Sequence, residues 1–227
     1  MKTILIADDL PAELDLFEVI LQRADCRLVR AEDGISALRL AREEKPDLIY
    51  LDVEMPGMGG GEVCRMLKAD PERRRVPVVL VSSHGRRDTA MKCGADQFLG
   101  KPVDEPTLLA TLEAFLRLQA RGERRLSVDW PLTFWREGSS HSGRILDVSR
   151  SGFFGECRRP QTVGSRLAVA FPLPDSGAGE DRTFVGEAIV VRWENAPRSG
   201  MGCRFFRMTS AGTAGLDRVF DESGAAG

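Results

Sequence analysis

The sequence predicts two consecutive domains, a doubly wound α/β domain with a five-stranded parallel sheet and then an antiparallel β domain. Three observations support this prediction. The chain has 227 residues, which is long for a single domain. Its first half alternates short apolar runs with helical patterns, as parallel strands joined by right-handed crossovers do. Its second half contains strand-like runs at regular spacing, separated by Gly, Ser, Pro and Asp.

The first half is expected to contain five strands and five helices in alternation. The apolar runs TILIAD, CRLVR, DLIYLD, VPVVLVSS and ADQFLG predict the strands, and helical patterns lie at 11–23, 34–44, 60–68, about 86–93 and 104–120. The last helix has Asp104 as its N-cap and Pro106 in its first turn.

In the second half, five runs predict antiparallel strands: SVDWPLTFW, HSGRILDVS, SRLAVAFPLP, RTFVGEAIVVRW and SGMGCRFF. Their regular spacing is typical of a barrel or a sandwich. PDSGAGED (174–181) predicts a polar hairpin loop, and residues 209–222 predict a short closing helix.

The composition indicates a cytoplasmic protein. No apolar run approaches the roughly 18 residues that a membrane span requires, so none is expected. The N-terminus MKTILIADDLPAE has no signal-peptide pattern. The five cysteines are scattered without a CxxC pair, which predicts free thiols and excludes a disulfide framework and a zinc site.

The two halves differ in charge. Residues 1–116 carry 16 Lys and Arg against 21 Asp and Glu, a net charge of −5, whereas residues 117–227 carry 16 against 13, a net charge of +3. All the cations of the second half are arginines, which favour planar contacts to phosphates and guanine edges. A small anion suits this modest charge better than a duplex, so direct DNA binding is not expected.

Polar residues follow the predicted parallel strands at their carboxyl ends, where ligands bind in such sheets. Asp8 and Asp9 end the first strand, Asp52 the third and Ser82 the fourth, and Lys101 follows the fifth. Converging carboxylates predict a hard cation such as Mg²⁺. The hydroxyl and the lysine could hold phosphoryl oxygens, and a carboxylate such as Asp52 can form an aspartyl phosphate.

The motifs ILIADD, LDVEMPGMGG, VVLVSS and GADQFLGKP resemble the receiver domain of bacterial response regulators over residues 1–118. The resemblance implies a flavodoxin-like fold in which Asp52 accepts phosphate from a histidine kinase or phosphotransfer protein. It also implies roles for further residues: Asp8, Asp9, Asp52 and the Glu54 backbone carbonyl at Mg²⁺, Ser82 and Lys101 at the phosphoryl group, and Phe98 as the aromatic switch.

The second half contains R-x-x-x-R at Arg121 and Arg125, then D-x-S-x-x-G at Asp147, Ser149 and Gly152. With the β-rich body that follows, these motifs resemble the PilZ domain, a β-barrel receptor for cyclic di-GMP, over residues 121–220. Arginines can clamp phosphates and bind guanine edges, the carboxylate can accept from guanine, and the hydroxyl can donate to a phosphate. Glycine permits a turn and close approach.

These resemblances imply a two-component response regulator with domains at 1–118 and 119–227. It would be a signalling protein and not an enzyme, and it would relay phosphorylation and cyclic di-GMP binding to an unknown protein target. The alternative is a phosphorylation-gated adaptor whose PilZ-like domain binds no nucleotide. The sequence leaves a homodimer open and identifies neither the kinase nor the target.

Overall fold

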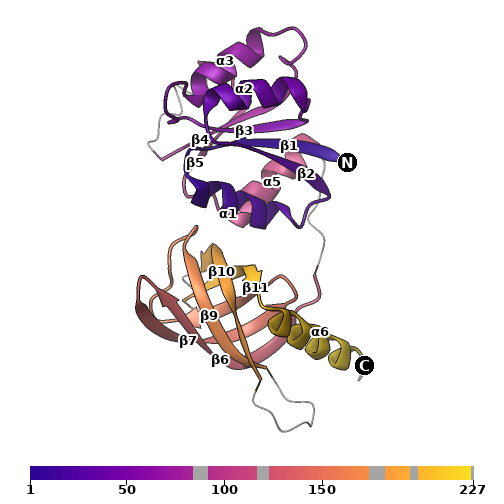
Figure 1. The fold of residues 1–227 in the computed structure, drawn as a ribbon, viewed down its shortest axis with the longest axis vertical. Helices are drawn as coiled ribbons and strands as arrows, with labels where there is room; N and C mark the ends of the chain where they lie inside the picture. Colours follow the sequence, from indigo (N-terminus) through magenta and orange to yellow (C-terminus); the bar gives the residue numbers. More distant parts are fainter. Residues whose placement is uncertain (84–91, 117–122, 174–181, 195–198, 226–227) are drawn as a thin grey trace. The chain divides into compact units, whose positions relative to one another are not determined.

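A computed structural model describes residues 1–83, 92–116, 123–173, 182–194 and 199–225 (Figure 1). The contacts within the chain divide it into two compact units, Met1–Arg121 and Gly122–Gly227. Each unit has its own hydrophobic core. None of the helices in the described residues is long and apolar enough to cross a membrane.

The first unit is a parallel sheet covered by helices, which confirms the predicted fold class. Its sheet has the order β2-β1-β3-β4-β5, and every adjacent pair is parallel. Its described elements are, in chain order, β1 (Lys2–Ala7), α1 (Pro11–Leu21), β2 (Cys26–Ala31), α2 (Gly34–Glu43), β3 (Leu48–Asp52), α3 (Gly60–Ala69), β4 (Val78–Ser82), β5 (Gln97–Gly100) and α5 (Glu105–Leu116).

The helices form two layers, with α1 and α5 on one face of the sheet and α2 and α3 on the other (Figure 1). The central strands β3 and β4 are buried along their whole length, as expected for a sheet covered on both sides. Asp104 caps α5, because its Oδ1 accepts a hydrogen bond of 3.0 Å from the Thr107 N–H. Most of the helix predicted at 86–93 lies outside the described residues.

The second unit is a closed antiparallel barrel with the strand order β10-β11-β8-β7-β6-β9. This arrangement decides between the two architectures that the strand spacing left open. Its described elements are β6 (Leu126–Arg136), β7 (Ser139–Ser149), β8 (Gly152–Cys157), β9 (Arg166–Leu173), β10 (Arg182–Glu194), β11 (Gly200–Met208) and α6 (Ser210–Ala225). The barrel interior is filled by aromatic rings, among them Phe171 and Phe184, which stack at 4.4 Å between centroids.

Strand β8 is absent from the sequence prediction. Its residues GFFGEC do not alternate between apolar and polar, and five of the six are buried. Glycine is required at the start of this strand, because a Cβ on Gly152 would lie 2.1 Å from the Cys203 carbonyl oxygen of β11. The close approach that was expected at Gly152 is therefore made to a neighbouring strand. The predicted loop at 174–181 lies outside the described residues, and the five cysteines are free thiols.

Candidate functional site

Three carboxylates converge at the carboxyl end of the parallel sheet. Asp8, Asp9 and Asp52 each offer an oxygen within 4.8 Å of the others. Asp8 follows β1 and Asp52 ends β3, which is the neighbour of β1 in the sheet. Asp8 and Asp52 are buried, at 4% and 5% exposure. The structure therefore confirms the prediction that these three carboxylates lie close together.

Lys101 neutralises part of this negative charge. Its Nζ lies 2.6 Å from Asp8 Oδ2 and 2.9 Å from Asp52 Oδ1, and its side chain is 9% exposed. Burial lowers the pKa of Lys101, but hydrogen bonds and ion pairs with Asp8 and Asp52 outweigh burial and raise the pKa above its ordinary value. Lys101 is therefore held as an ammonium ion against both carboxylates.

A backbone hydrogen bond orients the Asp52 side chain, but burial disfavours its ionised form. Its Oδ2 accepts a hydrogen bond of 2.8 Å from the Glu54 N–H. Burial raises the pKa of Asp52 above its ordinary value, and Asp8 adds to this effect, although Lys101 and the Glu54 N–H oppose it. The first residue of α3 passes very close, because a Cβ on Gly60 would lie 2.1 Å from the Asp52 carbonyl oxygen.

Ser82 and Phe98 lie on the strands beside this cluster. Ser82 ends β4, is 1% exposed and pairs with Gly100 of β5. The Lys101 N–H donates a hydrogen bond of 2.9 Å to the Ser82 carbonyl, which links the two residues through the backbone. Phe98 is half-buried and packs against the core of this unit.

A fourth carboxyl, on Glu13, was missed by the sequence analysis. Burial raises the pKa of Glu13, and its charge interacts with Lys101, Asp8 and Asp52. Its buried Oε2 has no hydrogen-bond partner among the described residues. An acidic residue in the first turn of α1, the helix that follows the two aspartates, is the sequence signal that could have identified it.

The residues at this edge of the sheet fit a magnesium ion. Mg²⁺ prefers carboxylate oxygens and water, and it usually retains several of its water molecules. Among the described residues, three aspartates face one lysine here, so this part of the cluster keeps a net negative charge. The hydrogen-bonding capacity of Glu13 that remains unused is consistent with a hydrated cation nearby.

On the barrel, the second arginine of R-x-x-x-R meets the aspartate of D-x-S-x-x-G. Nε and Nη2 of Arg125 both contact Asp147 Oδ1, and the two side chains are 33% and 32% exposed. Arg125 directly precedes β6, and Asp147 lies near the end of β7. The structure therefore brings the two motifs together, although Arg121 lies outside the described residues.

A partly buried polar network around Glu123 was not predicted. Glu123, inside R-x-x-x-R, accepts hydrogen bonds from Ser151 at 2.5 Å and from Arg204 at 3.0 Å. Burial raises the pKa of Glu123, but hydrogen bonds from Ser151 and Ser149 and the charge of Arg204 bring it below its ordinary value. Ser149 is fully buried, and its single hydroxyl proton can donate either to Glu123 or to the Gly152 carbonyl, which lies 3.1 Å away.

The remaining arginines of the two motifs anchor helix α6. Arg150 pairs with Asp217 at 2.9 Å and with Asp221 at 2.6 Å. Arg124 donates to the backbone carbonyls of Phe220 at 3.3 Å and Ser223 at 2.7 Å. The motifs therefore connect the barrel to its C-terminal helix.

Comparison with known proteins agrees with both units. The sequence model of the response regulator receiver domain matches residues 4–113, and that of the PilZ domain matches residues 119–220. Response regulator PleD of Caulobacter vibrioides is 41% identical over 216 residues, which are 89% of this chain and 46% of PleD. The chain therefore spans about half the length of that relative.

Two further matches are confined to about half of this chain. Protein PilH of Pseudomonas aeruginosa is 38% identical over 119 residues, which are 51% of this chain and 98% of PilH. A solved signal receiver domain of a histidine kinase from Syntrophus aciditrophicus is 33% identical, with a TM-score of 0.49, over 52% of this chain and 91% of that one. From the family matches and the similarity to PilH, the chain belongs to the response regulator family and carries a receiver domain followed by a PilZ domain.

Proposed function

We propose that this chain is a phosphorylation-dependent response regulator whose PilZ domain binds cyclic di-GMP and relays both signals to a protein target. In the receiver domain, Asp52 would accept the phosphoryl group and Ser82 and Lys101 would contact it, with Phe98 as the switch residue. In the PilZ domain, Arg121, Arg125, Asp147, Ser149 and Gly152 would form the nucleotide site. The division at 1–118 and 119–227 belongs to the same proposal.

The observation that carries the receiver assignment is the contact of Lys101 with both Asp8 and Asp52 at the sheet edge. Asp8, Asp9, Asp52 and the Glu54 carbonyl would hold Mg²⁺, which would neutralise phosphoryl oxygens when it is bound. The ammonium group of Lys101 is close enough to Asp52 to pair with a phosphoryl oxygen on that residue.

The transfer itself requires a nucleophilic carboxylate. An oxygen of Asp52 attacks the phosphorus of a phosphohistidine on a histidine kinase or phosphotransfer protein, and a new P–O bond forms. The P–N bond breaks, and its electron pair remains on the imidazole nitrogen of the donor. The hydrogen bond from the Glu54 N–H holds the Asp52 carboxylate in one orientation during this exchange.

Labelling with a small phosphoryl donor tests this assignment. Acetyl phosphate should label the wild-type protein in the presence of Mg²⁺, whereas Asp52→Asn should not be labelled and EDTA should prevent labelling. Asp47→Asn is the matched control, because Asp47 also lies in this domain but pairs with Lys2 at its surface. Labelling of Asp52→Asn at the wild-type level would contradict the assignment.

A second candidate function is a phosphorylation-gated adaptor that binds no nucleotide. It is favoured because polar groups of the two motifs already form an ion pair and a hydrogen bond with one another. Arg125 pairs with Asp147, and the Ser149 hydroxyl donates to the Gly152 carbonyl. A nucleotide would have to replace these contacts. We prefer cyclic di-GMP binding as the function, because both motifs occur together in one PilZ domain.

Calorimetry with cyclic di-GMP distinguishes the two candidates. A hydrogen bond to a charged group contributes about 1.5–3 kcal/mol, so Arg125→Ala and Asp147→Ala should each weaken binding roughly tenfold or more. Asp129→Ala is the matched control, since it removes a similar arginine–aspartate pair, with Arg144, elsewhere on the barrel. Absence of binding to the wild-type protein would leave the adaptor as the function.

A further inference from the structure

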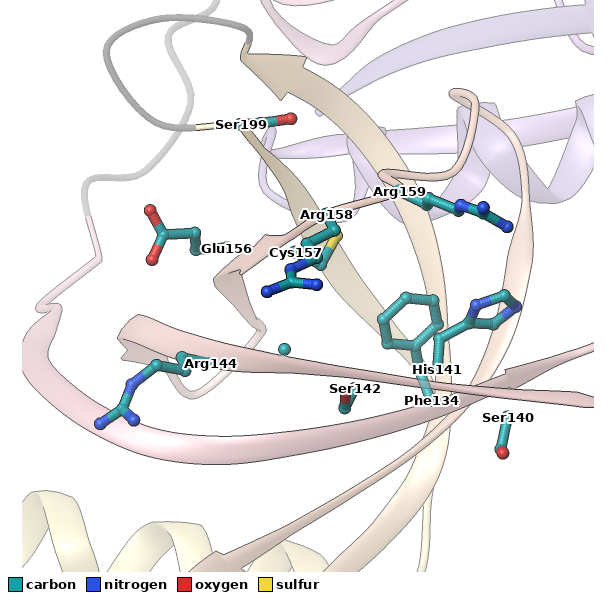
Figure 2. A pocket seen from close by; sticks show the side chains of 11 residues that line it. Phe134, Ser140, His141, Ser142, Arg144, Glu156, Cys157, Arg158, Arg159 and Ser199 are labelled. Carbon is teal, nitrogen blue, oxygen red and sulfur yellow. The ribbon is translucent and has the colours of Figure 1, made fainter.

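A cavity lies on the barrel at the opposite end of the β7–β8 hairpin from the D-x-S-x-x-G turn. It has a volume of about 820 Å³. Figure 2 shows it between the Ser140–Arg144 stretch of β7 and the Glu156–Arg159 stretch at the end of β8, with Ser199 on a third side. The proposed nucleotide site uses none of these residues.

One wall of the cavity is a strand edge. Strands β7 and β8 are paired from Ser149↔Gly152 to Gly143↔Cys157, where β8 ends. Strand β7 extends further, to Ser139, and on its other side these residues pair with β6, for example Thr133↔Ser142 and Trp135↔Ser140. Within the described residues, no strand pairs with the second edge of Ser139–Ser142.

The free edge carries hydrogen-bonding groups. In an antiparallel strand, the N–H and C=O groups of successive residues face alternate sides. About half of the backbone groups of Ser139–Ser142 therefore face the cavity side, where β8 would otherwise continue. Such an edge accepts an added strand. Four residues at about 3.3 Å each give roughly 13 Å of edge, enough for a short extended segment.

The cavity is positively charged beside this edge. Arg158 and Arg159 follow β8 directly and are exposed, and none of the described ion pairs or side-chain hydrogen bonds involves their guanidinium groups. Arg144 pairs with Asp129, and Glu156, the acidic residue of the lining, interacts with Arg144. The charges of Arg158 and Arg159 therefore remain uncompensated among the described residues.

An aromatic pair closes one end of the cavity. The half-buried His141 stacks on the buried Phe134 ring at 5.0 Å between centroids and an interplanar angle of 20°. Figure 2 shows these two rings side by side, with the Arg158 guanidinium between them and Arg144. A ligand in the cavity thus meets backbone groups along one side, cations along the other and the half-buried His141 ring at one end.

We propose that this cavity binds an extended acidic segment of a partner protein, which adds as a strand to the free edge of β7. Backbone hydrogen bonds to Ser139–Ser142 align the segment, and its carboxylates pair with Arg158 and Arg159. Strand addition of this kind takes its affinity from main-chain bonds and its specificity from side-chain contacts. The proposal rests on the relay to a protein target proposed above, and it specifies the chemistry of the target's docking segment.

The test uses the full-length protein and a fluorescein-labelled hexapeptide of alternating threonine and glutamate. Fluorescence anisotropy should detect binding to the wild-type protein. The double variant Arg158→Glu, Arg159→Glu should weaken binding roughly tenfold or more, because it replaces both cations by carboxylates that repel the glutamates of the peptide. The matched control Arg207→Glu changes an exposed arginine of β11 and should leave the affinity unchanged.

Peptide variants separate charge from strand pairing without changing the protein. The same peptide with lysine in place of glutamate, and the glutamate peptide with N-methylated backbone amides, should both fail to bind. Equal binding by the N-methylated peptide would show a simple anion site and overturn the proposal. Equal binding to the double variant, or no binding of the glutamate peptide at millimolar concentration, would also overturn it.

The assay is independent of the proposed signalling chemistry. It contains no Mg²⁺, phosphoryl donor or nucleotide. Failure of the peptide to bind would therefore leave the phosphorylation and cyclic di-GMP assignments standing. Failure of those assignments would leave the peptide result unaffected.

Discussion

Replacing Lys101 by methionine should destabilise the receiver domain strongly in the absence of divalent cations. The Lys101 side chain is 9% exposed, and it pairs with two carboxylates whose side chains are each 5% exposed. Removing one partner of a buried ion pair costs about 3–5 kcal/mol, because the remaining charge is left without compensation. For a domain of this size, that loss corresponds to a decrease in Tm of roughly 10–20 °C.

Magnesium should reverse much of this loss. With Lys101 absent, Asp8, Asp9 and Asp52 repel one another, and a bound cation would restore the balance of charge. Mg²⁺ at about 100 times its Kd adds roughly 2.7 kcal/mol to the stability of the state that binds it. The variant should therefore gain more from Mg²⁺ than the wild-type protein does, since it starts from the greater electrostatic cost.

Two-transition melting provides the assay. The three tryptophans, Trp130, Trp135 and Trp193, all lie in the PilZ domain, so their fluorescence follows the barrel alone. Far-UV circular dichroism follows the unfolding of both domains. The transition that appears in circular dichroism but not in tryptophan fluorescence therefore gives the Tm of the receiver domain. Lys2→Met is the control, because it breaks an exposed pair with Asp47 that is worth less than about 1 kcal/mol. An unchanged receiver Tm for Lys101→Met in EDTA would refute the reasoning.

Four further predictions concern the two sites. In the metal-free protein, the Asp52 carboxyl should titrate at a pH above the ordinary aspartate value of 3.8, because burial raises its pKa; an NMR titration in EDTA measures this. Since ionised Asp52 is disfavoured in the fold, Asp52→Asn should stabilise the receiver near neutral pH and lose this advantage below pH 3.8, as thermal melts across pH would show. Arg204→Met should cost the barrel about 3 kcal/mol in urea unfolding followed by tryptophan fluorescence, because Glu123 loses its buried partner. Phosphorylation of Asp52 should change cyclic di-GMP affinity roughly 5- to 150-fold in calorimetry, and equal affinities would show that the domains are uncoupled.

The receiver fold and its acidic cluster were predictable because local patterns determine them. Each strand is a continuous apolar run, and parallel strands bring their carboxyl ends to one edge regardless of the loops between them. Asp8 and Asp52 could therefore be placed together from sequence alone. Glu13 was not, because its approach to the cluster depends on the rotation of α1 against the sheet.

The barrel was harder to predict because its contacts join distant residues. Strand β8 has no alternating pattern, since Gly152 and Gly155 leave room for neighbouring strands and side chains on both sides. The pair Glu123–Arg204 joins residues 81 positions apart, so no local pattern indicates it. The two motifs still predicted that Arg125 and Asp147 lie close together, and the two side chains pair in the structure.

The two groups of arginines on the barrel differ in what binding can gain from them. Arg125 already pairs with Asp147, and Arg150 pairs with α6, so a nucleotide that uses either residue gains only the difference between phosphate and carboxylate contacts. Arg158 and Arg159 have no such partners among the described residues, so an acidic ligand there exchanges only water for an ion pair. Mutations at the first group therefore change both the free and the bound protein, whereas mutations at the second should act on the bound state alone.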